Sequence, residues 1–281
     1  MTAAVPALID THLHLIHRDQ LTYDWLQGQP QLNASDFTLS DMQALAAGRI
    51  TGSVFMEVDA TDYRLEARMV KGLMTPGSGL LGQIASCRPE LDEGFDAWLA
   101  DCDALNVVGF RRILHEGPDD ISRHDTFRAN VRKIGASGRA FDMVYLARQL
   151  PVALELACAC PDMPLVLDHC GNPDIARGAM DPWRGDMARL AEQPQVHCKL
   201  SGILSNCAPG TASLDLVRPW VAHVIEVFGP SRVLWGSDWP VVNRGGGLPL
   251  WLDITDGLLA GLSAGEQDAI RVGTAQRVYR L

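Results

Sequence analysis

The sequence lacks the features that mark several large classes of protein. No uncharged apolar run approaches the roughly 20 residues that a membrane-spanning helix needs. The opening stretch, MTAAVPALID, has neither the basic region nor the apolar core of a secretory signal. No run of Lys or Arg interrupts an acidic balance of 24 basic and 34 acidic residues, a net charge of −10. We therefore expect a cytoplasmic protein that binds neither membranes nor nucleic acid.

Patterns typical of disulfide frameworks and zinc ribbons are also missing. The seven cysteines are an odd number, and they are scattered through apolar stretches, as at Cys158 and Cys160. This usage predicts buried, reduced thiols. Internal repeats, low-complexity tracts and long Pro, Gly or Ser linkers are absent as well. We expect one compact domain over residues 1–281.

What the sequence does contain is a regular alternation of strand-like and helix-like segments. Hydrophobic residues make up 47% of the chain, enough for one sizeable core. Pro219 is expected at the first position of a helix that continues to Phe228 and stops at Gly229-Pro230. The sequence contains eight strand-like segments that alternate with helix-like ones. This number predicts a (β/α)₈ barrel, the TIM-barrel architecture, with an open doubly wound sheet as the competing fold. The expected strands cover residues 7–15, 53–58, 80–85, 107–114, 141–145, 164–169, 196–200 and 232–235.

Ionisable residues gather at the ends of these expected strands. In barrel enzymes the catalytic groups lie at the carboxyl ends of the strands. His12 and His14 lie two apart at the end of the first strand, so they share a face and could clamp a metal ion. The later strands contribute Glu57, Arg111, Arg112, Asp168, His169, Lys199, Ser201, Ser237 and Asp238. This density of ionisable groups predicts an active site.

Several of these residues also have a structural interpretation. Glu57 could be a solvated carboxylate at a strand end, and His169 a hydrogen-bonded histidine of the core. Arg111 and Arg112 are neighbours in a strand, so one should enter the barrel mouth while the other pairs with a carboxylate outside. Lys199 could extend its amine from an otherwise buried strand.

Eight segments together resemble the amidohydrolase superfamily, and within it the branch of sugar-lactone and related lactone hydrolases. They are DTHLH at 10–14, YDWL at 23–26, VGFRRILHE at 108–116, ARQLP at 147–151, VLDHCGNPDI at 166–175, CKLSG at 198–202, GSDWPV at 236–241 and TAQRVYRL at 274–281. The resemblance implies that His12, His14 and Asp238 are metal-site positions and that Asp238 is also the general base. It implies that His169 is the active-site histidine of strand 6 and that Arg111 binds or polarises the substrate.

The remaining candidates complete the expected site. Glu57 is a further candidate metal ligand, and Arg112, Lys199 and Trp239 are candidate substrate-binding residues. Binuclear members of the superfamily use a strand-4 lysine and a strand-5 histidine, which this chain lacks. We therefore expect at most one divalent ion, Zn²⁺ or Mn²⁺. Lactonases of this branch often have Gln, His and Gln where this chain has Leu13, Arg112 and Glu57, a difference that bears on the substrate.

The expected reaction is hydrolysis of a lactone, most simply a sugar-acid lactone. Asp238 would remove a proton from water, while His169 and Arg111, or a metal ion, would stabilise the oxyanion. The alternative is a nonhydrolytic decarboxylase for a carboxylated aromatic or muconate-type substrate, whose carboxylate Arg111 and Arg112 could hold. A barrel deoxyribonuclease fits the acidic charge less well, and a noncatalytic binding barrel would need only the pocket.

Overall fold

The computed structural model describes residues 7–32 and 35–281. It contains eight strands: β1 (Ile9–Leu13), β2 (Gly52–Met56), β3 (Leu80–Ser86), β4 (Val107–Ile113), β5 (Ala140–Val144), β6 (Leu165–Leu167), β7 (Val196–Leu200) and β8 (Val233–Trp235). All eight expected strands are present. Residues 1–6, which bear on the expected absence of a secretory signal, lie outside the described part of the chain.

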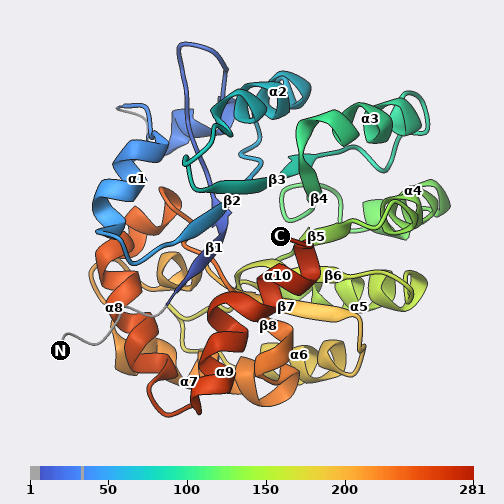
Figure 1. The fold of residues 1–281 in the computed structure, drawn as a ribbon. Coiled ribbons are helices and arrows are strands. Elements are labelled where there is room, and N and C mark those ends of the chain that lie inside the picture. Colours follow the sequence, from blue (N-terminus) through green and yellow to red (C-terminus); the bar gives the residue numbers. More distant parts are fainter. Residues whose placement is uncertain (1–6, 33–34) are drawn as a thin grey trace.

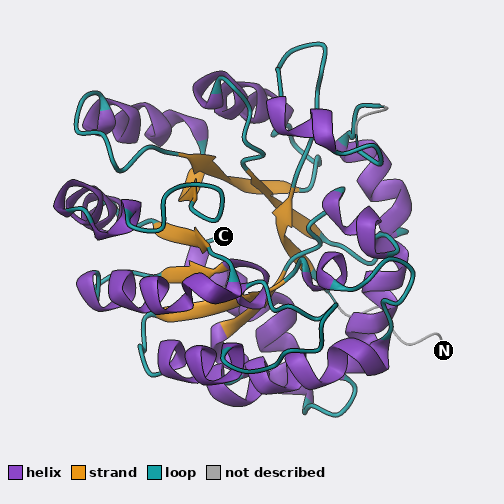
Figure 2. Ribbon diagram, turned by 180° about the vertical axis from the view of Figure 1, so that it is seen from behind, coloured by secondary structure: helices purple, strands orange, loops and turns teal. Residues whose placement is uncertain are grey.

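Helices alternate with the strands and surround them (Figures 1 and 2). They are α1 (Leu39–Ala46), α2 (Tyr63–Leu73), α3 (Phe95–Asp101), α4 (Asp125–Ala136), α5 (Leu150–Ala159), α6 (Trp183–Ala191), α7 (Leu214–Phe228), α8 (Leu248–Leu259), α9 (Ala264–Asp268) and α10 (Thr274–Tyr279). Within the described residues, no helix combines the length and the apolar character needed to cross a membrane.

The eight strands form one parallel sheet in the order β1 to β8. The two edges of this sheet meet just beyond β8. There the backbone N–H of Asp238 donates to the carbonyl of His12 at 2.9 Å, and the N–H of His14 donates to the carbonyl of Trp239 at 2.9 Å. The prediction of a (β/α)₈ TIM barrel is thereby confirmed. These closing bonds also bring the last strand end directly against the first.

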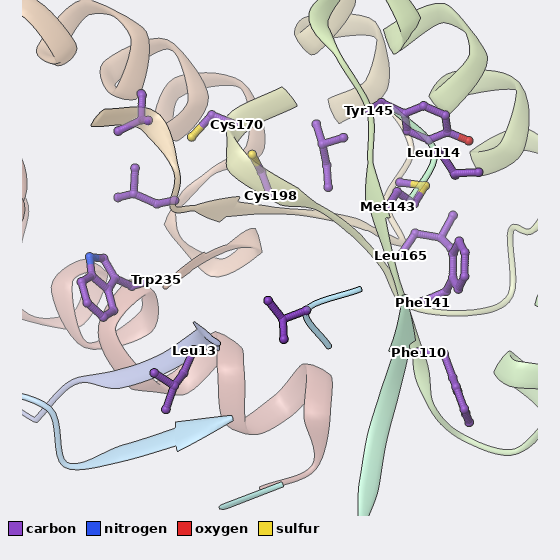
Figure 3. Packing of buried hydrophobic residues seen from close by; sticks show 14 of the residues in the cluster. Leu13, Phe110, Leu114, Phe141, Met143, Tyr145, Leu165, Cys170, Cys198 and Trp235 are labelled. Atoms are coloured by element: carbon purple, nitrogen blue, oxygen red, sulfur yellow. The ribbon is translucent and has the colours of Figure 1, made fainter. Parts of the chain in front are cut away.

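The apolar side chains form two cores, one outside and one inside the ring of strands. The outer core lies between strands and helices and includes Phe110 and Phe141, each fully buried (Figure 3). Burial of a side chain of this size contributes about 1.5–3 kcal/mol. The inner core joins residues of the strands, among them Val54 and Ile84, to Val278 and Tyr279 of α10. Helix α10 therefore closes one end of the barrel, and Figure 1 shows it across the centre of the ring.

Two expectations about particular residues were wrong. Pro219 lies inside α7, because Ser213 begins the helix earlier by accepting a hydrogen bond from the N–H of Leu216 at 3.3 Å. Cys158 is exposed on α5, while Cys160, at the end of that helix, is buried as expected. The helical period explains the second error, since residues two apart on a helix point in different directions.

Candidate active site

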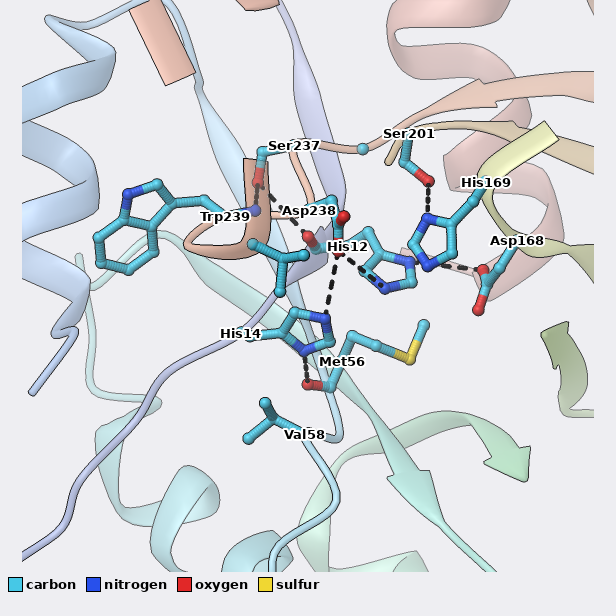
Figure 4. A network of polar contacts seen from close by, with 12 residues as sticks. His12, His14, Met56, Val58, Asp168, His169, Ser201, Ser237, Asp238 and Trp239 are labelled. Atoms are coloured by element: carbon cyan, nitrogen blue, oxygen red, sulfur yellow. Dashed lines mark hydrogen bonds and ion pairs between the residues drawn. The ribbon is translucent and has the colours of Figure 1, made fainter. Parts of the chain in front are cut away.

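A cavity of about 310 Å³ opens at the carboxyl ends of the strands. The side chains that line it come from the carboxyl ends of seven strands or the segments that follow them, and include His14, Asp59, Arg111, His169 and Asp238. This is the end at which barrel enzymes carry their catalytic groups. Four of the residues expected at the active site, His14, Arg111, His169 and Asp238, line this cavity. Figure 4 shows His12, which is fully buried, beside His14, His169 and Asp238.

The imidazoles of His12 and His14 are both oriented by a second contact. Nδ1 of His14 donates to the carbonyl of Met56 at 2.9 Å, because a carbonyl can only accept. Nε2 of His12 lies 3.2 Å from Nη1 of Arg111, and because a guanidinium can only donate, this nitrogen is an acceptor. The proton of His12 is therefore on Nδ1, which faces Oδ1 of Asp168 at 3.4 Å. The Nε2 atom of each imidazole faces Asp238.

Asp238 completes a set of three converging ligand atoms. Its Oδ1 lies 3.5 Å from Nε2 of His14 and 3.8 Å from Nε2 of His12, and all three residues are buried. The candidate ligand atoms of the three residues all lie within 4.8 Å of one another. His12, His14 and Asp238 therefore suit a divalent metal ion, and two imidazoles and a carboxylate are typical ligands of zinc.

Arg111 faces the cavity and Arg112 faces away from it. Nε of Arg111 donates to Oε1 of Glu57 at 2.7 Å, and Nη2 donates to the Glu57 carbonyl at 2.6 Å. Arg112 instead pairs with Glu90 at 2.8 Å and does not line the cavity. Burial would raise the pKa of Glu57, but the charge and hydrogen bond of Arg111, together with the hydrogen bond from the Asp59 N–H, lower it overall. Glu57 thus holds Arg111 in place and stays outside the cluster of potential metal ligands.

Lys199 lies beneath the cavity in a buried ionic network. Its Nζ is 2.5 Å from Oδ2 of Asp142 and 3.1 Å from Oδ1 of Asp168, and all three side chains are fully buried. The hydroxyl of Tyr279 donates to Asp142 at 2.8 Å. Burial would raise the pKa of Asp168, but Lys199 and His12 hold it well below its usual range. The network keeps Asp168 ionised opposite Nδ1 of His12, so Lys199 supports the site from behind.

His169 is placed by an unusual backbone turn after β6. His169 and Cys170 have φ angles of 55° and 52°, in the left-handed region. Nδ1 of His169 lies 3.0 Å from the hydroxyl of Ser201 at the end of β7, and the His169 ring lies 4.5 Å from that of His12 between centroids. Burial lowers the pKa of both histidines, so both imidazoles are neutral at neutral pH.

Left-handed backbone is concentrated around the cavity. Ala47, Asn106 and Arg280 adopt it at the ends of helical turns, where it is common. The other residues with such φ angles, apart from glycines, follow strands: Asp59 (55°), His169 (55°), Cys170 (52°), Asn172 (48°) and Asp238 (57°). All of these except Cys170 line the cavity. Conformations of this kind cluster at functional sites, where they direct side chains toward a ligand.

The last expected substrate-binding residue, Trp239, is buried in the wall of the barrel. It is 1% exposed, its ring lies edge to face with Phe37 at 5.4 Å between centroids, and it does not line the cavity.

Three ionisable residues at or near the site were not expected there from the sequence: Asp142, His115 and Asp59. Asp142 was the only ionisable residue in its strand, and that signal could have identified it as a partner for Lys199. His115 and Asp59 follow β4 and β2 and line the cavity.

The fold and the His/Asp cluster at the barrel rim define an amidohydrolase-type barrel enzyme. A family model described as Amidohydrolase matches residues 9–281. The chain belongs to the amidohydrolase family.

Individual relatives agree with this assignment. An L-fucono-1,5-lactonase of Burkholderia multivorans is 28% identical over 291 residues, covering 97% of this chain and 96% of the relative. An L-fucono-1,5-lactonase of Burkholderia ambifaria is 38% identical over 139 residues, covering 49% of this chain and 48% of the relative, so in that alignment the chain spans about half the relative's length. A crystal structure of an amidohydrolase from Burkholderia multivorans with bound zinc superposes with a TM-score of 0.90 at 25% identity, covering 98% of this chain and all of the other.

Proposed function

We propose that this protein hydrolyses a lactone, with a sugar-acid lactone as its substrate. The observation that carries the proposal is the placement of the Asp238 carboxylate beside His12 and His14, at the wall of a cavity that Arg111 also lines. Relatives named L-fucono-1,5-lactonase support the choice of a lactone. A lactone is a cyclic ester, so its hydrolysis requires a base for water and a positive group near the carbonyl oxygen.

The side chains of the cavity have complementary roles in this reaction. The Asp238 carboxylate accepts a proton from the attacking water, which then adds to the lactone carbonyl. Arg111, held by Glu57, and His169 provide donors for the oxygen that becomes negative. As the tetrahedral intermediate collapses, the ring C–O bond breaks, and the proton taken up by Asp238 is delivered to the departing ring oxygen. The products are one hydroxy acid and the regenerated Asp238 carboxylate.

A single divalent ion, Zn²⁺ or Mn²⁺, would be held by His12, His14 and Asp238. When bound, such an ion supplies a positive charge that polarises the carbonyl and lowers the pKa of water. The zinc in the Burkholderia multivorans amidohydrolase supports this assignment. Arg111 contacts Nε2 of His12 and also Oδ2 of Asp168 at 3.4 Å, so its charge occupies the region beside the first ligand set and disfavours a second cation.

We therefore predict at most one tightly bound divalent ion per chain. Elemental analysis of the purified protein should find zinc or manganese at a ratio between zero and one. Replacing His14 with Ala should abolish the bound ion, whereas the same change at the exposed His124 should leave the ratio unchanged. Two ions per chain in the wild-type protein would contradict the assignment.

The proposed reaction is tested by a pH-indicator screen of sugar-acid lactones and aromatic-pathway lactones, with and without Zn²⁺ or Mn²⁺. On the best substrate, Asp238→Asn should lower kcat by about 100-fold or more, because it removes the base while retaining size and tolerance of the left-handed backbone. Circular dichroism and thermal melting should show a folded variant. Near wild-type turnover in that variant would contradict the assignment of Asp238 as the general base.

The alternative reaction, decarboxylation, requires that Arg111 and Arg112 both face the cavity and together bind the carboxylate of the substrate. Arg112 points away from the cavity toward Glu90, and Arg111 already pairs with Glu57. This arrangement leaves no pair of free guanidinium groups and favours hydrolysis over decarboxylation. Carbon dioxide release, measured in parallel with acid release, separates the two reactions.

A further inference from the structure

The cavity is also lined by a second organised group of residues, Trp25 together with Val58 and Asp59. Trp25 belongs to the short helical turn Asp24–Gly28 after β1, and Asp59 follows β2. Both line the cavity. The indole Nε1 of Trp25 donates to the carbonyl of Val58 at 2.8 Å, so the aromatic side chain is fixed to the backbone immediately before Asp59.

The backbone that holds Asp59 is fixed from both sides. The N–H of Val58 donates to Oε1 of the buried Glu66 at 3.3 Å, and the N–H of Asp59 donates to Oε2 of Glu57 at 3.0 Å. Glu57 is held in turn by Arg111. Asp59 has a φ of 55°, the same left-handed conformation as Asp238 and His169. These contacts hold the half-buried Asp59 side chain in the cavity wall.

The Asp59 carboxylate has no hydrogen-bond or ion-pair partner among residues 7–32 and 35–281. A carboxylate has two oxygens that accept hydrogen bonds and none that donates, so its natural ligand at this position is a donor. Two neighbouring hydroxyl groups of a ligand can donate hydrogen bonds to the two carboxylate oxygens. The C–H face of a saturated ring can pack on the indole of Trp25. An aromatic ring and a free carboxylate on one wall therefore match a polyhydroxylated ring.

The charges of the wall favour an uncharged substrate over an acidic one. The acidic residues that line the whole cavity are Asp59, Glu116 and Asp238, and the basic ones are Arg111, which Glu57 neutralises, and the exposed Arg244. The net charge of −10 adds to the repulsion of an anion. We infer that Trp25 and Asp59 form a binding subsite for the hydroxylated face of a neutral sugar lactone, and that Asp59 discriminates against carboxylated lactones. This inference rests on the proposed lactonase function for its substrate.

The first test measures binding without turnover. Uncharged 1,5-anhydroalditols of several configurations have the hydroxylated ring but no lactone carbonyl, and their binding can be followed by NMR titration against tetrahydropyran as the ring without hydroxyls. Asp59→Asn should weaken binding of the best anhydroalditol by about 10-fold or more, the loss expected for a hydrogen bond to a charged group. Trp25→Leu should weaken it too. Asp162→Asn, an exposed acid outside the cavity, is the matched control and should bind like the wild type.

The second test uses turnover and separates binding from catalysis. For a hydroxylated lactone, Asp59→Asn should raise KM by a similar factor with kcat within about threefold. Its activity on δ-valerolactone, which has no hydroxyls, should be unchanged, and its relative activity on a carboxylated lactone should rise. Equal losses on hydroxylated and unsubstituted lactones would assign Asp59 a catalytic or structural role instead.

The two sets of results distinguish this inference from the proposed function. If the wild type binds anhydroalditols in an Asp59-dependent way but opens no lactone, the subsite stands and the lactonase proposal fails. If the wild type opens lactones while Asp59→Asn changes neither binding nor selectivity, the subsite is overturned and the lactonase proposal stands. A wild-type protein that prefers carboxylated lactones would also contradict the inferred subsite.

Discussion

Arg111 shows how a single side chain connects the parts of the site. Its guanidinium donates a hydrogen bond to Glu57 and lies 3.4 Å from Asp168. It also donates to Nε2 of His12, so the proton of the neutral His12 ring is on Nδ1. The planar group reaches these partners from three separate nitrogens, which an ammonium cannot do. The residue therefore contributes both charge and orientation.

We predict that Arg111→Lys keeps the charge but raises KM and lowers kcat by about 10-fold or more, because the fork that orients His12 and meets the substrate is lost. Steady-state kinetics on the best lactone measure both constants. Arg112→Lys is the matched control and should retain activity, since Arg112 pairs with Glu90 outside the cavity. Full activity in Arg111→Ala together with loss in Arg112→Ala would reverse the assignment.

At the scale of the elements, the turns after the strands position side chains of the candidate site. The chain leaves β6 through His169 and Cys170 in left-handed conformation, and it leaves β7 through Ser201 and Gly202. These two turns touch, because a Cβ atom on Gly202 would lie 2.4 Å from Nδ1 of His169. Gly202 itself has a φ of 62°, so glycine is required there both for the backbone and for the histidine.

Gly202→Ala should therefore displace His169 and lower kcat by about 10-fold or more, with a smaller effect on thermal stability. Turnover and melting temperature measured on the same preparation distinguish the two effects. Gly210→Ala is the matched control, because Gly210 also has a left-handed φ of 74° but no atom within 4 Å of the added methyl group. Equal activity losses in both variants would indicate that backbone strain alone, and not the contact with His169, is responsible.

At the scale of the whole molecule, the partly buried His197 makes stability depend on pH. Burial lowers the pKa of His197, on β7, to about 4, whereas a histidine in the unfolded chain titrates near 6.5. Between these values the unfolded chain binds more protons than the folded one. The contribution of His197 is therefore fully present above pH 6.5 and is lost as the pH falls toward 4.

We predict that the free energy of unfolding falls between pH 6.5 and 4, with His197 contributing at most about 3 kcal/mol of the loss. Urea denaturation at four pH values in this range measures it. His197→Gln retains a donor for the Gln195 carbonyl, which Nδ1 of His197 contacts at 3.1 Å, but cannot titrate, so its stability should depend less steeply on pH. An identical dependence in wild type and variant would mean that His197 does not contribute.

Local sequence pattern was sufficient to predict the barrel. Strand segments and helical segments differ in the period of their apolar residues, and that period is a property of neighbours in the chain. The same holds for His12 and His14, whose spacing places them on one face before any tertiary contact is known. The positions of His169 and Asp238 at strand ends followed from the barrel and from the family resemblance.

Only the tertiary structure decided which partners these residues have. Strand alternation places Arg111 and Arg112 on opposite faces, but which of them faces inward depends on how the strand lies in the closed barrel. Lys199 is a buried counter-ion outside the cavity lining because Asp142 and Asp168, on or next to two other strands, pair with it. Partners of this kind are separated by tens of residues along the chain, so no local pattern identifies them. The sequence alone determined the architecture and the edge that holds the site, while closure of the barrel determined the contacts that orient each ionisable group.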